Sequence, residues 1–363
     1  MRRARPAGLA ASRERLFKAA VYGVLALFTA GWIVAVVSAD TAEKAAELHG
    51  VLSAASSLNP NALPPNAYLL DAAITEIAEM SGYTGESGQL RVIVRAAGDT
   101  MPVPDSLAPD VSLGFTRTGT DNASAAASAQ SRPDAPGIWN MLVRVRDGLR
   151  VVPDMKVITL VPLSEKHNGR IGGYLVGSWP YEKGARPRSP AYAPPRGLVR
   201  VMPQDRDIPV SEHFKLGDFV TKGQENVWPK YVAMSPRLLD KLELTIDELE
   251  RSGQPVKNIG IISGFRTPSY NEGGGNPAGR AALSRHMYGD AMDWYVDNDR
   301  NGRMDDLNHD GRFNKNDAAV IRNAAEKVER EHPSLMGGVG LYDPTGGHGG
   351  FVHIDTRGYR ARW

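Results

Sequence analysis

Two histidines and one aspartate stand at spacings that suit a hydrolytic metal site. His286 and Asp293 lie seven residues apart with Gly289 between them, and His353 follows in the run Gly350-Phe-Val-His-Ile-Asp355. Two histidines and one carboxylate can hold zinc and leave its fourth position open for water. The chain contains no cysteine, so a zinc site here must use histidine, aspartate or glutamate.

The residues around Asp293 and His353 alternate in the manner of β-strands. In the first run Asp293 shares a face with Ala291 and Tyr295, and in the second run His353 shares a face with Asp355. Two neighbouring strands would therefore direct both side chains into one cleft. A lone histidine is more often a surface-turn or core residue, but the combined pattern favours a metal site.

Three motifs occur in order along the C-terminal part of the chain. They are Ser263-Gly-Phe-Arg-Thr-Pro-Ser-Tyr-Asn271, then Ser284-x-His286-x-x-Gly289-x-Ala291-x-Asp293, and finally Gly-Gly-Val-Gly-Leu-Tyr342 with Phe351-Val-His353-Ile-Asp355. Together they resemble the D-Ala-D-Ala carboxypeptidase-like zinc peptidases, whose fold is shared with lysostaphin-type endopeptidases and the Hedgehog signalling domain. The resemblance covers residues 210–363 and implies an α+β domain with an antiparallel sheet.

This resemblance also implies roles for individual residues. Zinc held by His286, Asp293 and His353 would lower the pKa of a bound water and polarise a peptide carbonyl. Arg266, at the end of an expected strand, would bind substrate or the developing oxyanion, the alternative being a surface salt bridge. Asp355 would orient a ligand histidine through a hydrogen bond.

The general base is the weakest part of the resemblance. Many relatives carry a glutamate three residues before the last histidine, where this chain has Gly350. Other relatives place a histidine five residues before that ligand, and here this residue is His348, flanked by glycines. We expect His348 to take or give a proton, the alternative being an ordinary loop histidine.

A second metal signal lies between Asp293 and His353. Residues 306–317 match a calcium-binding EF-hand loop, with glycine at the sixth position and aspartate rather than glutamate at the twelfth. An overlapping copy begins at residue 297, so the insertion 297–317 resembles a dockerin-type loop, and the alternative is a solvated acidic turn. The expected calcium ligands are Asp306, Asn308, Asp310, Arg312, Asn314 and Asp317, with Asp297, Asp299 and Asn301 in the first copy.

The N-terminus predicts export. Residues 1–18 are strongly basic and residues 19–39 carry no formal charge over 21 positions, a length that spans a bilayer. The basic flank would stay in the cytoplasm, which predicts a single-pass protein of the cytoplasmic membrane with a periplasmic catalytic domain. A cleaved signal peptide ending at Val37-Ser38-Ala39 is the alternative.

The remaining chain predicts an accessory module and a linker. Residues 40–182 read as a small α/β module with a low-complexity loop at 116–137, residues 183–199 as a proline-rich linker, and residues 200–363 as the peptidase domain. Expected strands are 89–95, 139–145, 155–161, 173–176 and 256–262, and expected helices lie within 41–80, from 236 to about 252, and at 318–331.

These observations predict a zinc peptidase that acts on the peptide stems of peptidoglycan, as a D,D-carboxypeptidase or an endopeptidase. The alternatives are an inactive domain that binds cell-wall peptide and a calcium-dependent surface interaction protein. Forty-three basic and 41 acidic residues give a net charge of +2, which offers no argument for nucleic-acid binding.

Overall fold

The computed structural model describes residue 77 and residues 89–100, 111–119, 132–145, 148–184, 186–187, 189–273, 281–345 and 347–363. All of them belong to one unit that spans residues 59–363. The expected basic segment 1–18, the apolar segment 19–39 and nearly all of the helical region 41–80 lie outside the described residues. Within the ranges given above, no helix is both long and apolar enough to cross a membrane.

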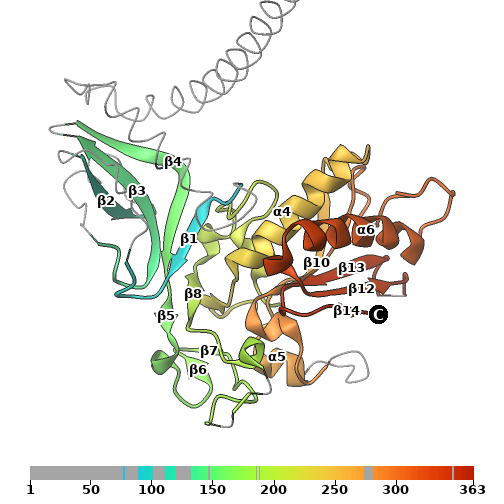
Figure 1. Cartoon of the computed structure of the whole chain (residues 1–363). Coiled ribbons are helices and arrows are strands. Elements are labelled where there is room, and N and C mark those ends of the chain that lie inside the picture. Colours follow the sequence, from blue (N-terminus) through green and yellow to red (C-terminus); the bar gives the residue numbers. More distant parts are fainter. Residues whose placement is uncertain are drawn as a thin grey trace, which may run out of the picture. The chain divides into compact units, whose positions relative to one another are not determined.

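The N-terminal part of the described chain forms a four-stranded sheet in the order β1-β4-β3-β2 (Figure 1). Its strands are β1 Val92–Arg95, β2 Val111–Arg117, β3 Gly137–Val145 and β4 Gly148–Thr159. β1 pairs with β4 in parallel and the other neighbours are antiparallel. The expected loop 116–137 is therefore shorter than predicted, because its first two residues complete β2 and its last residue begins β3.

Short strands connect this sheet to the rest of the chain. They are β5 Val161–Pro162, β6 Arg170–Ile171, β7 Tyr174–Leu175, β8 Gly197–Val201 and β9 Lys230–Val232. β8 lies between β5 and β9 in one sheet, and β6 pairs with β7. Asn168 and Gly169 form a turn: both residues have positive φ, and they join His167 to Arg170 across a β-bridge.

The proline-rich segment 183–199 does not separate two cores. Val161 and Pro162 before it pair with Leu198 and Gly197 at its end. One hydrophobic cluster runs from Val92 in β1 through Leu198 in β8 to the C-terminal strands. The structure differs here from the expected linker because a two-residue strand such as β5 needs a partner to satisfy its backbone groups, and β8 is that partner.

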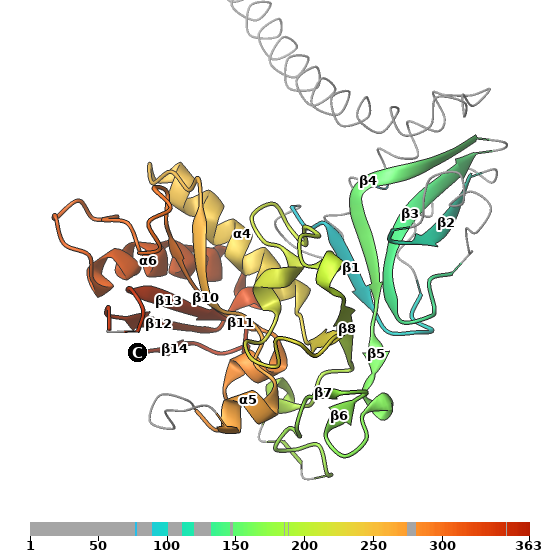
Figure 2. The ribbon, with the colours of Figure 1, turned by 180° about the vertical axis from the view of Figure 1, so that it is seen from behind.

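The C-terminal part forms a five-stranded sheet in the order β10-β11-β13-β12-β14, antiparallel except for the last pair. The strands are β10 Ile259–Ser263, β11 Ala291–Val296, β12 Gly338–Tyr342, β13 Phe351–Asp355 and β14 Ala361–Arg362. The helices are α4 Pro236–Arg251, α5 Pro268–Gly273 and α6 Lys315–Glu331. α6 packs on β12, β13 and α4 (Figure 2). The predicted α+β class with an antiparallel sheet holds for this part.

Local sequence explains most of these elements. α4 begins at Pro236 as predicted and buries its apolar stripe, although the side chain of Ser235 makes no capping hydrogen bond. α6 begins three residues earlier than expected, because Asn314 and Asp317 form a capping box at its start. β10 starts at Ile259 and is only half-buried, since it lies at the sheet edge.

Candidate metal centre

The β-sheet register brings two of the three expected ligands together. Asp293 in β11 lies directly opposite His353 in β13. His286 comes from the short 3-10 helix Arg285–Tyr288, which ends at Gly289 in the left-handed conformation with φ of 71°. A Cβ atom at Gly289 would lie 2.3 Å from the backbone of Ala233. Both the positive φ and this lack of space therefore require glycine at the turn.

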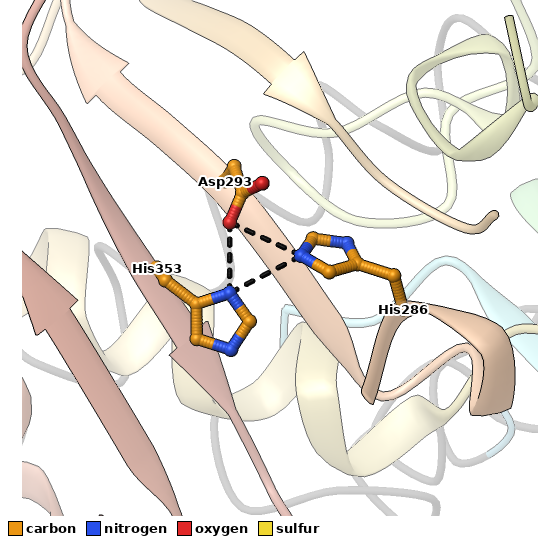
Figure 3. Close-up of side chains that lie close together, drawn as sticks. All are labelled: His286, Asp293 and His353. Carbon is orange, nitrogen blue, oxygen red and sulfur yellow. Dashed lines mark hydrogen bonds and ion pairs between the residues drawn. The ribbon is translucent and has the colours of Figure 1, made fainter. Parts of the chain in front are cut away.

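The three side chains converge on one point (Figure 3). His286 Nε2 lies 3.1 Å from Asp293 Oδ1 and 3.2 Å from His353 Nδ1, and His353 Nδ1 lies 2.8 Å from Asp293 Oδ1. Ligand atoms bound tetrahedrally at zinc distances would lie roughly 3.3 Å from one another. The donor atoms therefore already stand close to the spacing that zinc requires, and all three side chains are buried.

Outer contacts fix which atom of each side chain faces this point. His286 Nδ1 lies 2.7 Å from the carbonyl of Gly264, so it donates its proton there and leaves the Nε2 lone pair free. His353 Nε2 lies 3.1 Å from Asp355 Oδ2, which leaves Nδ1 as the free nitrogen. Arg266 Nη2 donates to Asp293 Oδ2 at 2.6 Å, so Oδ1 is the oxygen that faces the histidines.

The protonation of each of these three side chains depends on the other two. Burial opposes ionisation of Asp293, but His286 and His353 hold the pKa of its carboxyl well below the usual range. Burial lowers the pKa of His286. Burial also acts to lower the pKa of His353, but hydrogen bonds to Asp293 and Asp355 raise this pKa to about 9. This donor set of two imidazoles and one carboxylate fits a zinc ion.

Several hydrogen bonds fix the position of Asp355. Its Oδ1 accepts hydrogen bonds from the backbone N–H groups of Gly338 at 2.8 Å and Arg357 at 3.1 Å, and the Arg357 Nε donates to both carboxylate oxygens at 2.9 Å. Its backbone carbonyl accepts from the buried Lys241 in α4, which also pairs with Glu329 in α6. The orientation of His353 is thus supported by both helices.

The donor atoms open into a cavity of about 480 Å³. Besides the ligands and Arg266, its walls include five residues that the sequence did not indicate as site residues: Tyr192, Arg285, Tyr342, Arg357 and Trp363. Four of these lie in or near the recognised motifs, and that closeness could have indicated them as site residues. Tyr192 lies in the proline-rich segment, where composition carries no such signal.

His348 does not line this cavity. It lines a neighbouring cavity of about 530 Å³ together with Arg303, Met304 and Phe313. Its Nδ1 lies 2.8 Å from the carbonyl of Gly349, and its ring packs edge-on against Phe351 at 4.9 Å. Phe351 lines the metal cavity, so one aromatic ring stands between His348 and that space.

The acidic insertion folds into two successive turns. In the first, carboxylate oxygens of Asp297, Asp299 and Asp305 lie within 4.8 Å of one another. In the second, Asp306 accepts from the backbone of Asp310 and Gly311, and Asp317 is engaged in capping α6. The grouped carboxylates are therefore in the first copy of the loop, whereas the sequence pattern favours the second.

Comparison with known proteins agrees with this geometry in the C-terminal part of the chain. No curated protein and no solved structure matches. Residues 224–363, however, match the model of the M15 peptidase family described as peptidoglycan L,D-endopeptidase MepK, which confirms the resemblance to these zinc peptidases for this part of the chain.

Proposed function

We propose that this protein is a zinc-dependent peptidase that cleaves the peptide stems of peptidoglycan. The family match supports a peptidase of this class. The observation that carries the zinc dependence is the convergence of His286 Nε2, Asp293 Oδ1 and His353 Nδ1 within 3.2 Å of one another. Between the two modes of action, the family description favours an endopeptidase over a carboxypeptidase.

Zinc bound by these three residues would activate a water molecule and polarise the scissile carbonyl. Arg266 holds Asp293 through Nη2, and its Nε donates to Ser263 at 2.8 Å. The guanidinium also lines the cavity, where it would donate to a substrate carbonyl oxygen.

We keep His348 as the proposed proton-transfer residue. With its Nδ1 donating to the carbonyl of Gly349, the Nε2 lone pair is free to accept a proton. A shift of residues 347–350 on substrate binding would be needed to bring His348 past Phe351. Loss of turnover in His348→Ala with unchanged zinc content would support this role.

The proposal includes export. The apolar segment 19–39 and its basic flank would anchor the protein in the cytoplasmic membrane, with the peptidase domain on the outer side. Sedimentation with membranes after an alkaline wash, and loss of that behaviour when residues 1–39 are deleted, would support it. Release of the intact chain by the wash would contradict it.

The proposal also includes calcium in the insertion 297–317. Carboxylate oxygens and turn glycines fall at the positions that calcium loops use, and Asp297, Asp299 and Asp305 would supply the charge. Calcium titrated into the purified chain should raise its thermal midpoint, and Asp299→Asn should reduce that shift. An unchanged midpoint at millimolar calcium would contradict it.

The central experiment uses the whole chain, because a fragment that begins at residue 200 would lose the β5–β8 pairing. Zinc per chain is counted, and release of peptide from purified cross-linked stems is followed. His286→Ala should lose zinc and hydrolysis together. The matched control is His167→Ala, which removes an exposed histidine elsewhere and should change neither.

The outcomes separate the candidate functions. Zinc near one equivalent with hydrolysis that depends on His286 establishes the enzyme. Zinc without cleavage of any stem peptide favours a domain that only binds cell-wall peptide. Absence of zinc in the wild-type chain contradicts the proposed site.

A further inference from the structure

One wall of the metal cavity comes from outside the family match. The short 3-10 helix Pro190–Tyr192 lies in the segment that composition alone predicts to be a linker. It is fixed to the ligand-bearing loop, because Arg285 Nη1 donates to the carbonyl of Ala191 at 2.6 Å and the ring of Tyr192 packs edge-on against Tyr288 at 5.7 Å. Tyr192 is therefore held in place as part of the cavity wall by these two contacts.

The hydroxyl of Tyr192 meets the phenol of Tyr359, which is 45% exposed and is not among the described residues that line the cavity. Its oxygen lies 3.0 Å from the hydroxyl of Tyr359, and the guanidinium of Arg357 lies over the Tyr359 ring at 5.6 Å. Two hydroxyls that share one hydrogen bond use one of their two protons. Burial and this hydrogen bond raise the pKa of Tyr192, whereas hydrogen bonds from Tyr192 and Arg357 lower the pKa of Tyr359.

The lining of the cavity carries more guanidinium groups than carboxylates. Arg266, Arg285 and Arg357 line it, whereas Asp293 is the single carboxylate among the described lining residues. The three guanidinium groups pair with Asp293, Asp290 and Asp355. These pairs balance, so a divalent metal would leave the site with a net positive charge.

Arg357 lies close to the metal ligands. His353 Nε2 is 3.1 Å from Asp355 Oδ2, and Arg357 Nε is 2.9 Å from the same oxygen. The two nitrogens are thus at most about 6 Å apart, which is less than the span of two extended residues. Arg357 also lines the cavity into which the donor atoms open, so a group bound at Arg357 would belong to a residue near the scissile bond.

We propose that Tyr192, Tyr359 and Arg357 form a subsite for the α-carboxylate of the residue on the leaving side of the scissile bond. This inference rests on the proposed peptidase function. A terminal D-alanine carries such a carboxylate, and so does a cross-linking residue whose amine stands on the same carbon as a free carboxylate. Guanidinium and phenol donors together recognise that group and distinguish it from its neutral amide.

The test compares two cross-linked stem peptides that differ only in this group, a free α-carboxylate or its amide. The wild-type chain should cleave the carboxylate form with a kcat/KM higher by roughly tenfold or more, the value of one charge-assisted hydrogen bond. Tyr192→Phe should lower kcat/KM for the carboxylate form by about that factor and leave the amide form unchanged. Tyr231→Phe, a buried tyrosine outside the cavity, is the matched control and should change neither.

A binding measurement removes the dependence on turnover. Calorimetry on the zinc-free whole chain with the same two peptides should show a preference in the same direction, smaller because the charge of the metal is missing, and Tyr192→Phe should abolish it. If the wild type cleaves neither peptide but retains this preference in binding, the peptidase proposal fails and the subsite stands. Equal cleavage and equal binding of both peptides, or an equal loss on both in Tyr192→Phe, would overturn the subsite.

Discussion

Replacing Asp355 by asparagine should weaken zinc binding without removing a zinc ligand. Among the described contacts of the Asp355 carboxylate, every partner is a fixed N–H donor except His353, whose imidazole can donate or accept. An asparagine must place its NH₂ group against one of these partners, and only His353 can accept from it. Asp355→Asn should therefore move the His353 proton from Nε2 to Nδ1, the atom that faces the metal.

The expected magnitude follows from that change of tautomer. Loss of a carboxylate that orients a ligand histidine typically lowers metal affinity about 10- to 100-fold, which corresponds to about 1.4 to 2.7 kcal/mol. The buried position of His353, 6% exposed, prevents the ring from turning to present its other nitrogen at low cost. We therefore expect the upper half of this range.

The assay is a competition titration of zinc against a chromophoric chelator, with circular dichroism to establish that the variant is folded. Glu326→Gln is the matched control: it removes one negative charge from a half-buried ion pair between α6 and Arg362 and should leave zinc affinity unchanged. A folded Asp355→Asn chain whose zinc affinity lies within about twofold of wild type would refute the tautomer argument.

Two further predictions concern stability. Gly289→Ala places a side chain at φ of 71° and against the backbone of Ala233, so it should lower the free energy of unfolding by at least about 2 kcal/mol in urea titrations; a wild-type midpoint would show that the turn tolerates a side chain. A hydrogen bond to Glu243 raises the pKa of His213, so this pair stabilises the fold fully below the unfolded pKa of about 6.5 and loses its contribution as pH rises through the higher folded value. The loss of stability in His213→Gln should therefore be larger at pH 6 than at pH 9, and a pH-independent difference would refute it.

The convergence of His286, Asp293 and His353 was predictable because its signals are local. Strand alternation places Asp293 and His353 on defined faces, and the register that sets them opposite each other follows from pairing of two such strands. The pairing of His353 with Asp355 was likewise expected from their shared face. Each of these inferences needs only a few residues of sequence and the periodicity of a strand.

The features that the sequence did not predict depend on contacts between distant segments. Proline-rich composition at 183–199 predicts a linker, because composition reports backbone stiffness and says nothing of what the segment packs against. In the structure Tyr192 meets Tyr359 across 167 positions of sequence. The place of His348 depends on such contacts too: its spacing from His353 suggested a position beside the three donor atoms, but its ring lines the neighbouring cavity, so its role stays a prediction.

Asp355 connects the three donor side chains, whose convergence was predictable, with the proposed carboxylate subsite, which was not. It accepts from His353 on the metal side and from Arg357 on the side of the proposed carboxylate subsite. A change at Asp355 should therefore alter zinc affinity and carboxylate preference together, whereas a change at Tyr192 should alter the preference alone. Because one residue lies on a rigid strand and the other on a surface segment, substrate preference can vary through the wall at 189–193 while the metal centre stays intact.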